Sequence, residues 1–350
     1  MSELTTTRTS RADLHWRLLA TVSALALTAL PLSAKAEDAD HPTLWIELGG
    51  AFDQISHDAT GWVPHNLPAP ITNVAPEPFG KLPAIGYDFE GAITLQPKGS
   101  EWSYTASVRY GRAQRGPKHT HDQTYKQNAK YYLTTYAFLN STDKSYSSHA
   151  IIDFSAGKDI GLGSFHGGKA DIHFGVRIAQ LNEHAQGFLT AFSTAPKKYA
   201  AGKISHEADA LFVRSYKGAG PSVSWDSSTP LVATLNDGLS FDWGANAAVL
   251  LGQQKASLAL HTRNTRFAVN DSSGTVLAQS TAAPVRNRTT VVPNVGGFAG
   301  FSWRLPNGKV SLGYRADFFF GAIDGGIATS QKEMRGFYGP FATVSLGIGG

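Results

Sequence analysis

The chain has 350 residues, with 31 basic and 27 acidic side chains, 36 glycines, 11% aromatic residues and no cysteine. Because it lacks cysteine, a disulfide-stapled fold is excluded, and stability must come from core burial or from a closed hydrogen-bonded sheet. No basic stripe with interleaved aromatic residues is present, so a nucleic-acid-binding role is not expected.

The first 36 residues have the pattern of a secretory signal peptide. Several arginines precede the apolar run Leu18–Leu32, and Ala34 and Ala36 supply the small residues of a cleavage site. The run is about fifteen residues long, shorter than the roughly twenty that a spanning helix needs. We therefore predict cleavage after Ala36 and a single exported domain over residues 37–350, with 27 basic and 25 acidic residues.

The exported part shows period-two alternation of apolar and polar residues, which predicts β-strands because successive side chains point to opposite faces. Many of the segments are about as long as a tilted strand that crosses a bilayer, roughly 9–11 residues. No apolar run after residue 36 is long enough for a membrane helix. In chain order, the expected strands are 43–53, 84–95, 102–112, 148–157, 169–181, 204–216, 220–226, 239–251, 255–264, 291–303, 309–320 and 337–348.

The connections between these segments alternate between long and short. Gln54–Pro83 and Ala113–Ser147 are long, whereas Gln96–Glu101, Lys217–Ala219 and Gly252–Gln254 are short. Outer-membrane barrels combine long extracellular loops with short periplasmic turns. An even strand count then puts both chain ends on the periplasmic side, and the last strand should close the sheet against the first.

Alternation alone does not say which face of each strand is inside. A soluble all-β protein with its apolar face inward is the competing interpretation. Two features favour an outward apolar face, as in a membrane barrel. Charges cluster on the polar faces, at Asp88 and Glu90, at Asp171, His173 and Arg177, at Lys255, His261 and Arg263, and at Arg315 and Asp317. Aromatic residues gather near strand ends, as interface girdles would, at Trp45, Trp102, Tyr110, Trp303 and Tyr338.

The predicted fold is an all-β transmembrane antiparallel barrel of about 12 strands (range 10–14), a size that leaves a narrow lumen. The side chains expected to line this lumen are Glu90, Arg109, Asp171, Arg177, Asp242, Arg263, Arg315 and Asp317. For each of them the structural alternative is a charge pair across neighbouring strands.

Two features of the segment Ala113–Ser147 allow more than one interpretation. Its excess of lysine and arginine fits a hydrated loop, or a basic mouth that attracts anions or lipopolysaccharide phosphates. The pair His119 and His121 lacks further ligands and is interpreted as part of a solvated loop. No G-x-S-x-G motif or nucleotide-binding fingerprint is present, so neither catalysis nor a cofactor or metal site is predicted.

The C-terminal block resembles the Legionella-type major outer membrane protein family of pore-forming proteins. The similarity lies in Asn294–Gly326 and Gly336–Gly350, with weaker agreement in Ser240–Lys255, Ala170–Leu181 and the GAGPSV turn at Gly218–Val223. The resemblance implies an outer-membrane β-barrel with porin activity and supplies no catalytic motif. The glycine ending departs from the aromatic residue that closes many outer-membrane barrels.

The function predicted from the sequence is that of a porin in the bacterial outer membrane, through which small solutes or ions diffuse. The expected partners are outer-membrane lipids, lipopolysaccharide and the barrel assembly machinery. The alternative is a non-conducting surface protein, an adhesin or envelope anchor, that acts through its long loops. The sequence carries no readable oligomerisation motif.

Overall fold

The computed structural model describes residues 44–57, 84–128, 133–160, 169–194, 203–233, 238–267, 274–305, 307–325 and 330–348. The predicted signal peptide, including Ala34 and Ala36, lies outside these residues and stays a prediction. Within the described ranges, no helix is long and apolar enough to cross a membrane.

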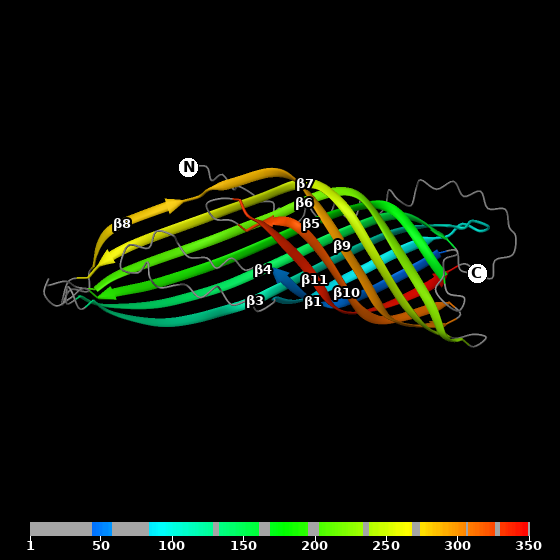
Figure 1. The fold of residues 1–350 in the computed structure, drawn as a ribbon, viewed down its shortest axis with the longest axis horizontal. Coiled ribbons are helices and arrows are strands. Elements are labelled where there is room, and N and C mark those ends of the chain that lie inside the picture. The colour runs from blue at the N-terminus through cyan, green and yellow to red at the C-terminus, as the bar shows by residue number, and fades with distance from the viewer. Residues whose placement is uncertain are drawn as a thin grey trace, which may run out of the picture. The chain divides into compact units, whose positions relative to one another are not determined.

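Eleven strands in the described ranges form one antiparallel sheet (Figure 1). They are β1 (Leu44–His57), β2 (Ala84–Leu95), β3 (Trp102–Asn128), β4 (Leu133–Asp159), β5 (Lys169–Thr194), β6 (Lys203–Ala233), β7 (Gly238–Arg266), β8 (Thr275–Ala282), β9 (Val285–Leu305), β10 (Gly308–Asp324) and β11 (Lys332–Ile348).

The sheet closes on itself into a barrel. Its strand order is β6-β5-β4-β3-β2-β1-β11-β10-β9-β7-β8, and β6 also pairs with β7, which joins ten strands in a ring and leaves β8 outside it. The predicted closure of the last strand against the first is confirmed, from Leu44 opposite Ile348 to His57 opposite Arg335. A closed ring leaves no unpaired edge within the barrel.

The expected count of about twelve strands is corrected to ten in the barrel, because two predicted tight turns do not exist. Strand β6 runs without a break through Lys217–Ala219, and β7 runs through Gly252–Gln254. Gly218 and Gly252 do not have positive φ. Instead, their missing side chains allow neighbouring atoms of β6 and β7 to approach the backbone closely. A Cβ on Gly218 would lie 2.2 Å from the Tyr216 hydroxyl, and one on Gly252 would lie 2.5 Å from Gly218 Cα.

The short turns at one end of the barrel agree with the prediction. Strand β2 ends at Leu95 and β3 begins at Trp102, with the Ser100 amide donating to the Pro97 carbonyl at 3.0 Å. Strands β9 and β10 are separated by only two residues. This end, which also holds Leu44 and Ile348, is called the turn end below.

Several predicted loops are strands instead. Ala113–Asn128 and Leu133–Ser147 form the far halves of β3 and β4, paired from Ala113 opposite Ser147 to Asn128 opposite Leu133, apart from a bulge after Arg115. Strands β5, β6 and β7 are similarly long, and β8 pairs with the far part of β7. The far parts of β3, β4, β5, β6 and β7, together with β8, form a six-stranded sheet that continues beyond the ends of β1, β2 and β11 (Figure 1). We call this sheet the extension.

The apolar faces of the barrel strands point outward, as predicted. On β10, Val310, Leu312 and Tyr314 are exposed, whereas Ser311, Arg315 and Asp317 are buried inside the ring. Four of the five predicted girdle aromatics lie on the outer face, but Trp45 points inward and lines a cavity. Phe319, which breaks the alternation in sequence, is fully buried in the interior.

The predicted inward position of Lys255, His261 and Arg263 is wrong. A turn at Gly252–Gln254 would have reset the side-chain alternation. Because β7 is continuous, the odd-numbered positions that place Trp243 and Leu251 outside also place these three residues outside, in the exposed face of the extension.

Gly339 tests the close approach of β11 to β1. A Cβ at this position would lie 1.8 Å from the Phe52 carbonyl oxygen, whereas a Cβ at Gly91, on the outer face of β2, would meet nothing closer than a Leu48 methyl group at 3.6 Å. We expect Gly339→Ala to reduce strongly the yield of the compact form that shifts on heating in gel electrophoresis. Gly91→Ala should leave that yield unchanged; equal losses in both variants would contradict the assigned register.

Candidate functional site

A layer of charged side chains crosses the barrel interior at the level of β10 residues Arg315 and Asp317. Arg315 donates to Asp88 and Glu90, both on β2, which is separated from β10 by β1 and β11. Arg109 Nη2 on β3 lies 2.6 Å from Asp317 Oδ2. These pairs connect strands that are not neighbours, so they pass through the lumen rather than along the wall.

Arg177 on β5 completes this layer from the opposite wall. Its guanidinium donates to Asp153 Oδ1 at 2.7 Å and to Asp153 Oδ2 at 3.0 Å. The Nη1 atom donates to Asn246 Oδ1 at 2.7 Å and to the Asn294 carboxamide. The same atom lies 3.9 Å from Asp317, which links Arg177 to the Arg109 and Arg315 pairs. We call these residues the charged layer.

An apolar layer lies directly beyond the charged layer, on the side away from the turn end. Its members come from nine strands around the ring and are each at most 5% exposed. The Phe319 and Phe337 rings pack edge to face at 6.1 Å, and the Tyr216 hydroxyl donates to the Leu250 carbonyl at 3.1 Å. The layer consists of Ile55, Ala113, Ile151, Ala179, Leu181, Tyr216, Ala248, Leu250, Val292, Phe319, Ala322, Ile323 and Phe337.

A second group of buried charges covers the apolar layer toward the extension. Arg335 donates to Glu183 across the interior, and Arg214 Nη1 lies 3.8 Å from the same carboxylate. Arg214 also donates to the Gly325 carbonyl at 2.9 Å. Side chains therefore cross the lumen at three successive levels.

Between the charged layer and the turn end lies a cavity of about 1060 Å³. Most of the residues that line it are polar or charged, including Glu47, Asp153, Asp171, His173, Asp226 and Lys309, so the wall carries both charge signs. His173 Nε2 lies 3.6 Å from Asp226 Oδ2. Lys309 Nζ lies 2.7 Å from Asp242 Oδ2, which also accepts a hydrogen bond from the Ser302 hydroxyl at 2.6 Å. The other oxygen, Asp242 Oδ1, accepts from the Ser228 hydroxyl at 2.6 Å.

The structure places the eight predicted lining residues in three environments. Glu90, Arg109, Arg177, Arg315 and Asp317 belong to the charged layer. Asp171 lines the cavity, and Asp242 is buried against Lys309. Arg263 is the exception, since it lies on the outer face of the extension. For Glu90, Arg109, Arg177, Arg315 and Asp317, the pairing alternative describes the structure. Arg177 pairs with Asp153 on the adjacent strand β4, whereas Arg315 and Asp317 also pair across the lumen.

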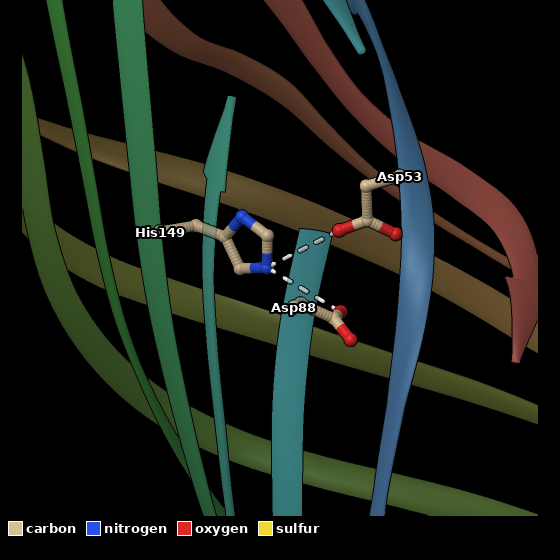
Figure 2. A group of neighbouring side chains, drawn as sticks. All are labelled: Asp53, Asp88 and His149. Carbon is tan, nitrogen blue, oxygen red and sulfur yellow. Dashed lines mark ion pairs between the residues drawn. The ribbon is translucent and has the colours of Figure 1, made fainter. Parts of the chain in front are cut away.

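Sequence reasoning missed a buried histidine beside the charged layer. His149 on β4 is 1% exposed, and its Nε2 lies 3.7 Å from both Asp53 Oδ2 and Asp88 Oδ2 (Figure 2). The potential ligand atoms of Asp53, Asp88 and His149 all lie within 4.8 Å of one another. The three residues are far apart in sequence, on β1, β2 and β4, so no local spacing could have indicated the cluster.

No family model and no curated protein matches the chain. Among solved structures, it is similar to the translocator domain of the autotransporter NalP from Neisseria meningitidis, at 12% identity and TM-score 0.23, covering 96% of this chain and 95% of that one. It is also similar to the transport unit of the autotransporter AIDA-I from Escherichia coli, at 6% identity and TM-score 0.26, covering 97% and 100%. These scores are too low to support a conclusion about this chain.

Removing Arg315 tests the energetic role of the charged layer. Arg315→Met leaves Asp88 and Glu90 buried without their main cationic partner, and breaking a buried pair costs about 3–5 kcal/mol. We expect that loss in the free energy of unfolding, measured by tryptophan fluorescence in detergent with increasing denaturant. Arg263→Met, on the exposed face of the extension, should change it by less than about 0.5 kcal/mol. Similar values for both variants would contradict the assigned pairing.

Proposed function

We propose that the chain is an outer-membrane barrel that anchors the extension at the bacterial surface and does not conduct in its resting state. The outward face of the barrel is lined with exposed apolar side chains, including Phe89, Val176, Leu251, Phe301 and Leu312. A continuous apolar surface of this kind is unfavourable in water and marks contact with lipid or protein. A bilayer accounts for it because exposed apolar residues recur on nine strands of the ring, and on β4 the half-buried Ile152 and Phe154 lie on the same face.

The apolar surface ends at paired positions on four adjacent strands. The outward sequence changes from Ile178 to Gln180 on β5, from Ala219 to Lys217 on β6, from Leu251 to Gln253 on β7 and from Val291 to Thr289 on β9. Gln180 is opposite Lys217, Lys217 is opposite Gln253, and Gln253 is opposite Thr289. A change from apolar to polar side chains that neighbouring strands share is expected where a barrel wall leaves the membrane.

The width of the apolar surface fits a bilayer. On β9 it extends from Val291 to Trp303. Twelve residue steps at about 3.4 Å, tilted by about 40°, span roughly 31 Å, close to the hydrocarbon thickness of about 30 Å. The far parts of β5, β6 and β7 lie beyond the polar boundary, and their outer face carries Glu207, Asp209 and Arg263 as well as Phe188 and Leu211. The extension would therefore stand in water, above the membrane.

Single cysteines can test this placement because the chain has none of its own. We expect Arg263→Cys to react with a membrane-impermeant maleimide on intact cells. Lys98→Cys, in the exposed turn between β2 and β3, should react only after the outer membrane is permeabilised. Val249→Cys, within the apolar surface, is the lipid-facing control and should react slowly in both cases. Equal labelling of Val249→Cys and Arg263→Cys would contradict a membrane band.

The side-chain layers inside the barrel support the proposal that the resting protein does not conduct ions. Ions need a hydrated path, but the lumen is crossed first by arginine–carboxylate pairs and then by the apolar layer, where Tyr216, Phe319 and Phe337 are at most 2% exposed. Small barrels of about eight strands are likewise filled by side chains. The exposed extension is then the part available for surface interactions.

Porin activity is the second candidate. It is favoured by the polar cavity of about 1060 Å³ at the turn end and by the resemblance to the Legionella-type major outer membrane protein family, which remains a proposal. It would require the apolar layer to move aside. Small solutes would then be selected by the field of the charged layer.

Planar-bilayer recording separates the two candidates. We expect refolded protein, verified as folded by its heat-dependent gel mobility, to give no sustained current steps, whereas a general porin reconstituted in the same way should give them. Discrete salt-dependent steps would overturn the non-conducting proposal. In that case Arg177→Glu and Arg315→Glu should shift the reversal potential toward cation preference if these residues line the path.

A further inference from the structure

We propose that Asp53, Asp88 and His149 form a binding site for a first-row divalent cation, with Zn²⁺ as the representative ion. The site would connect β1, β2 and β4 at the boundary between the charged layer and the apolar layer (Figure 2). Imidazole nitrogen and carboxylate oxygen are both ordinary zinc ligands, and three protein ligands leave a fourth position for water.

The distances fit metal ligands better than hydrogen-bond partners. His149 Nε2 lies 3.7 Å from an oxygen of Asp53 and an oxygen of Asp88, beyond the range of about 2.7–3.2 Å for a hydrogen bond. Two ligands about 2.0–2.2 Å from one tetrahedral ion are about 3.3–3.6 Å apart. The two separations from His149 therefore require only a slight contraction around an ion, and all the ligand atoms already lie within 4.8 Å of one another.

The atoms that face one another are also unpartnered. Asp53 Oδ2, Asp88 Oδ2 and both His149 ring nitrogens are buried without a hydrogen-bond partner among the described residues. Asp53 and Asp88 are each 2% exposed, and His149 is 1% exposed. Leaving buried polar atoms unsatisfied is unfavourable, and each such atom needs a physical explanation. One cation would satisfy one atom of each residue at once.

Charge balance points to a divalent ion. The cluster belongs to a larger set of neighbouring charges in the described ranges, which contains five carboxylates and three arginines. With a neutral His149, this set has a net charge of −2. Its members are Asp53, Asp88, Glu90, Asp153 and Asp317 against Arg109, Arg177 and Arg315. A protonated His149 would leave a net charge of −1, whereas one divalent cation neutralises the set, as a buried location favours.

Neighbouring residues hold the imidazole in this position. His149 is directly opposite Gly111 on β3, where a Cβ would lie 2.1 Å from the His149 Cε1 atom. The Phe337 ring packs against the imidazole with 4.0 Å between ring centroids. A glycine below and an aromatic ring beside the histidine fix its orientation toward the two carboxylates, as a preorganised ligand requires.

Metal content provides the first test. Protein would be refolded in detergent with Zn²⁺, passed over a chelating resin and analysed by mass spectrometry of the metal. We expect about one zinc per folded chain in the natural protein, and at least about tenfold less in His149→Ala and Asp53→Asn, since loss of a ligand removes most of the affinity. Asp153→Asn, a matched carboxylate in the same charged layer, should retain the zinc.

Cobalt provides a second measurement that needs no variant to fold. Co²⁺ added during refolding of the natural protein should give visible absorption bands of a low-coordinate nitrogen and oxygen site, and Zn²⁺ should abolish them. Natural protein that retains no more zinc than His149→Ala and shows no such bands would overturn the proposal and favour a protonated histidine between two carboxylates. Equal zinc loss in Asp153→Asn would also overturn it, because the layer's charge alone would then explain retention.

Discussion

Closure of the sheet into a ring of ten strands is the constraint on which the rest of the structure depends. Closure lets the backbone amides and carbonyls of each strand in the ring pair with a neighbouring strand on both sides, as is required of a chain that crosses a bilayer. Closure also assigns each strand one inner and one outer face. The period-two pattern of the sequence becomes an apolar outer wall and a polar interior only because the ring exists.

The small size of the ring decides what the interior can contain. With ten strands the lumen is narrow enough for arginine side chains from β3, β5 and β10 to reach carboxylates on strands that are not their neighbours. The free-energy cost of burying these charges is offset only when each charge has a close partner of opposite sign. Nearly every charge in the charged layer must therefore be paired for the folded state to be stable. The apolar layer beyond it adds ordinary packing between walls. Together they act as a core inside the barrel and make the ring rigid.

Much of the fold follows from local pattern. The alternation in Lys309–Phe320 and Tyr338–Ile348 predicts two neighbouring strands with apolar outer faces, and the structure confirms both the pairing and the orientation. The extension could not be read in the same way, because alternation between apolar and polar residues weakens where both faces of a sheet meet water. Glycine-rich segments at Gly218 and Gly252 resembled turns, yet glycine serves close packing there, against Tyr216 and between the two strands. That single misinterpretation reversed the expected side of Arg263.

The sequence by itself determined the strands of the barrel wall, because they depend on side-chain periodicity, and their outward apolar faces, because charges cluster on the opposite faces. The closure of the last strand on the first follows from the barrel that these patterns predict. Seven of the eight charges predicted to face inward do so. The tertiary structure alone decided which charges meet. Asp53, Asp88 and His149 come together, and Arg315 reaches β2, because strand tilt and stagger bring distant positions to one level of a narrow lumen. Those distances are set by ring size and register, which no local spacing in the chain encodes.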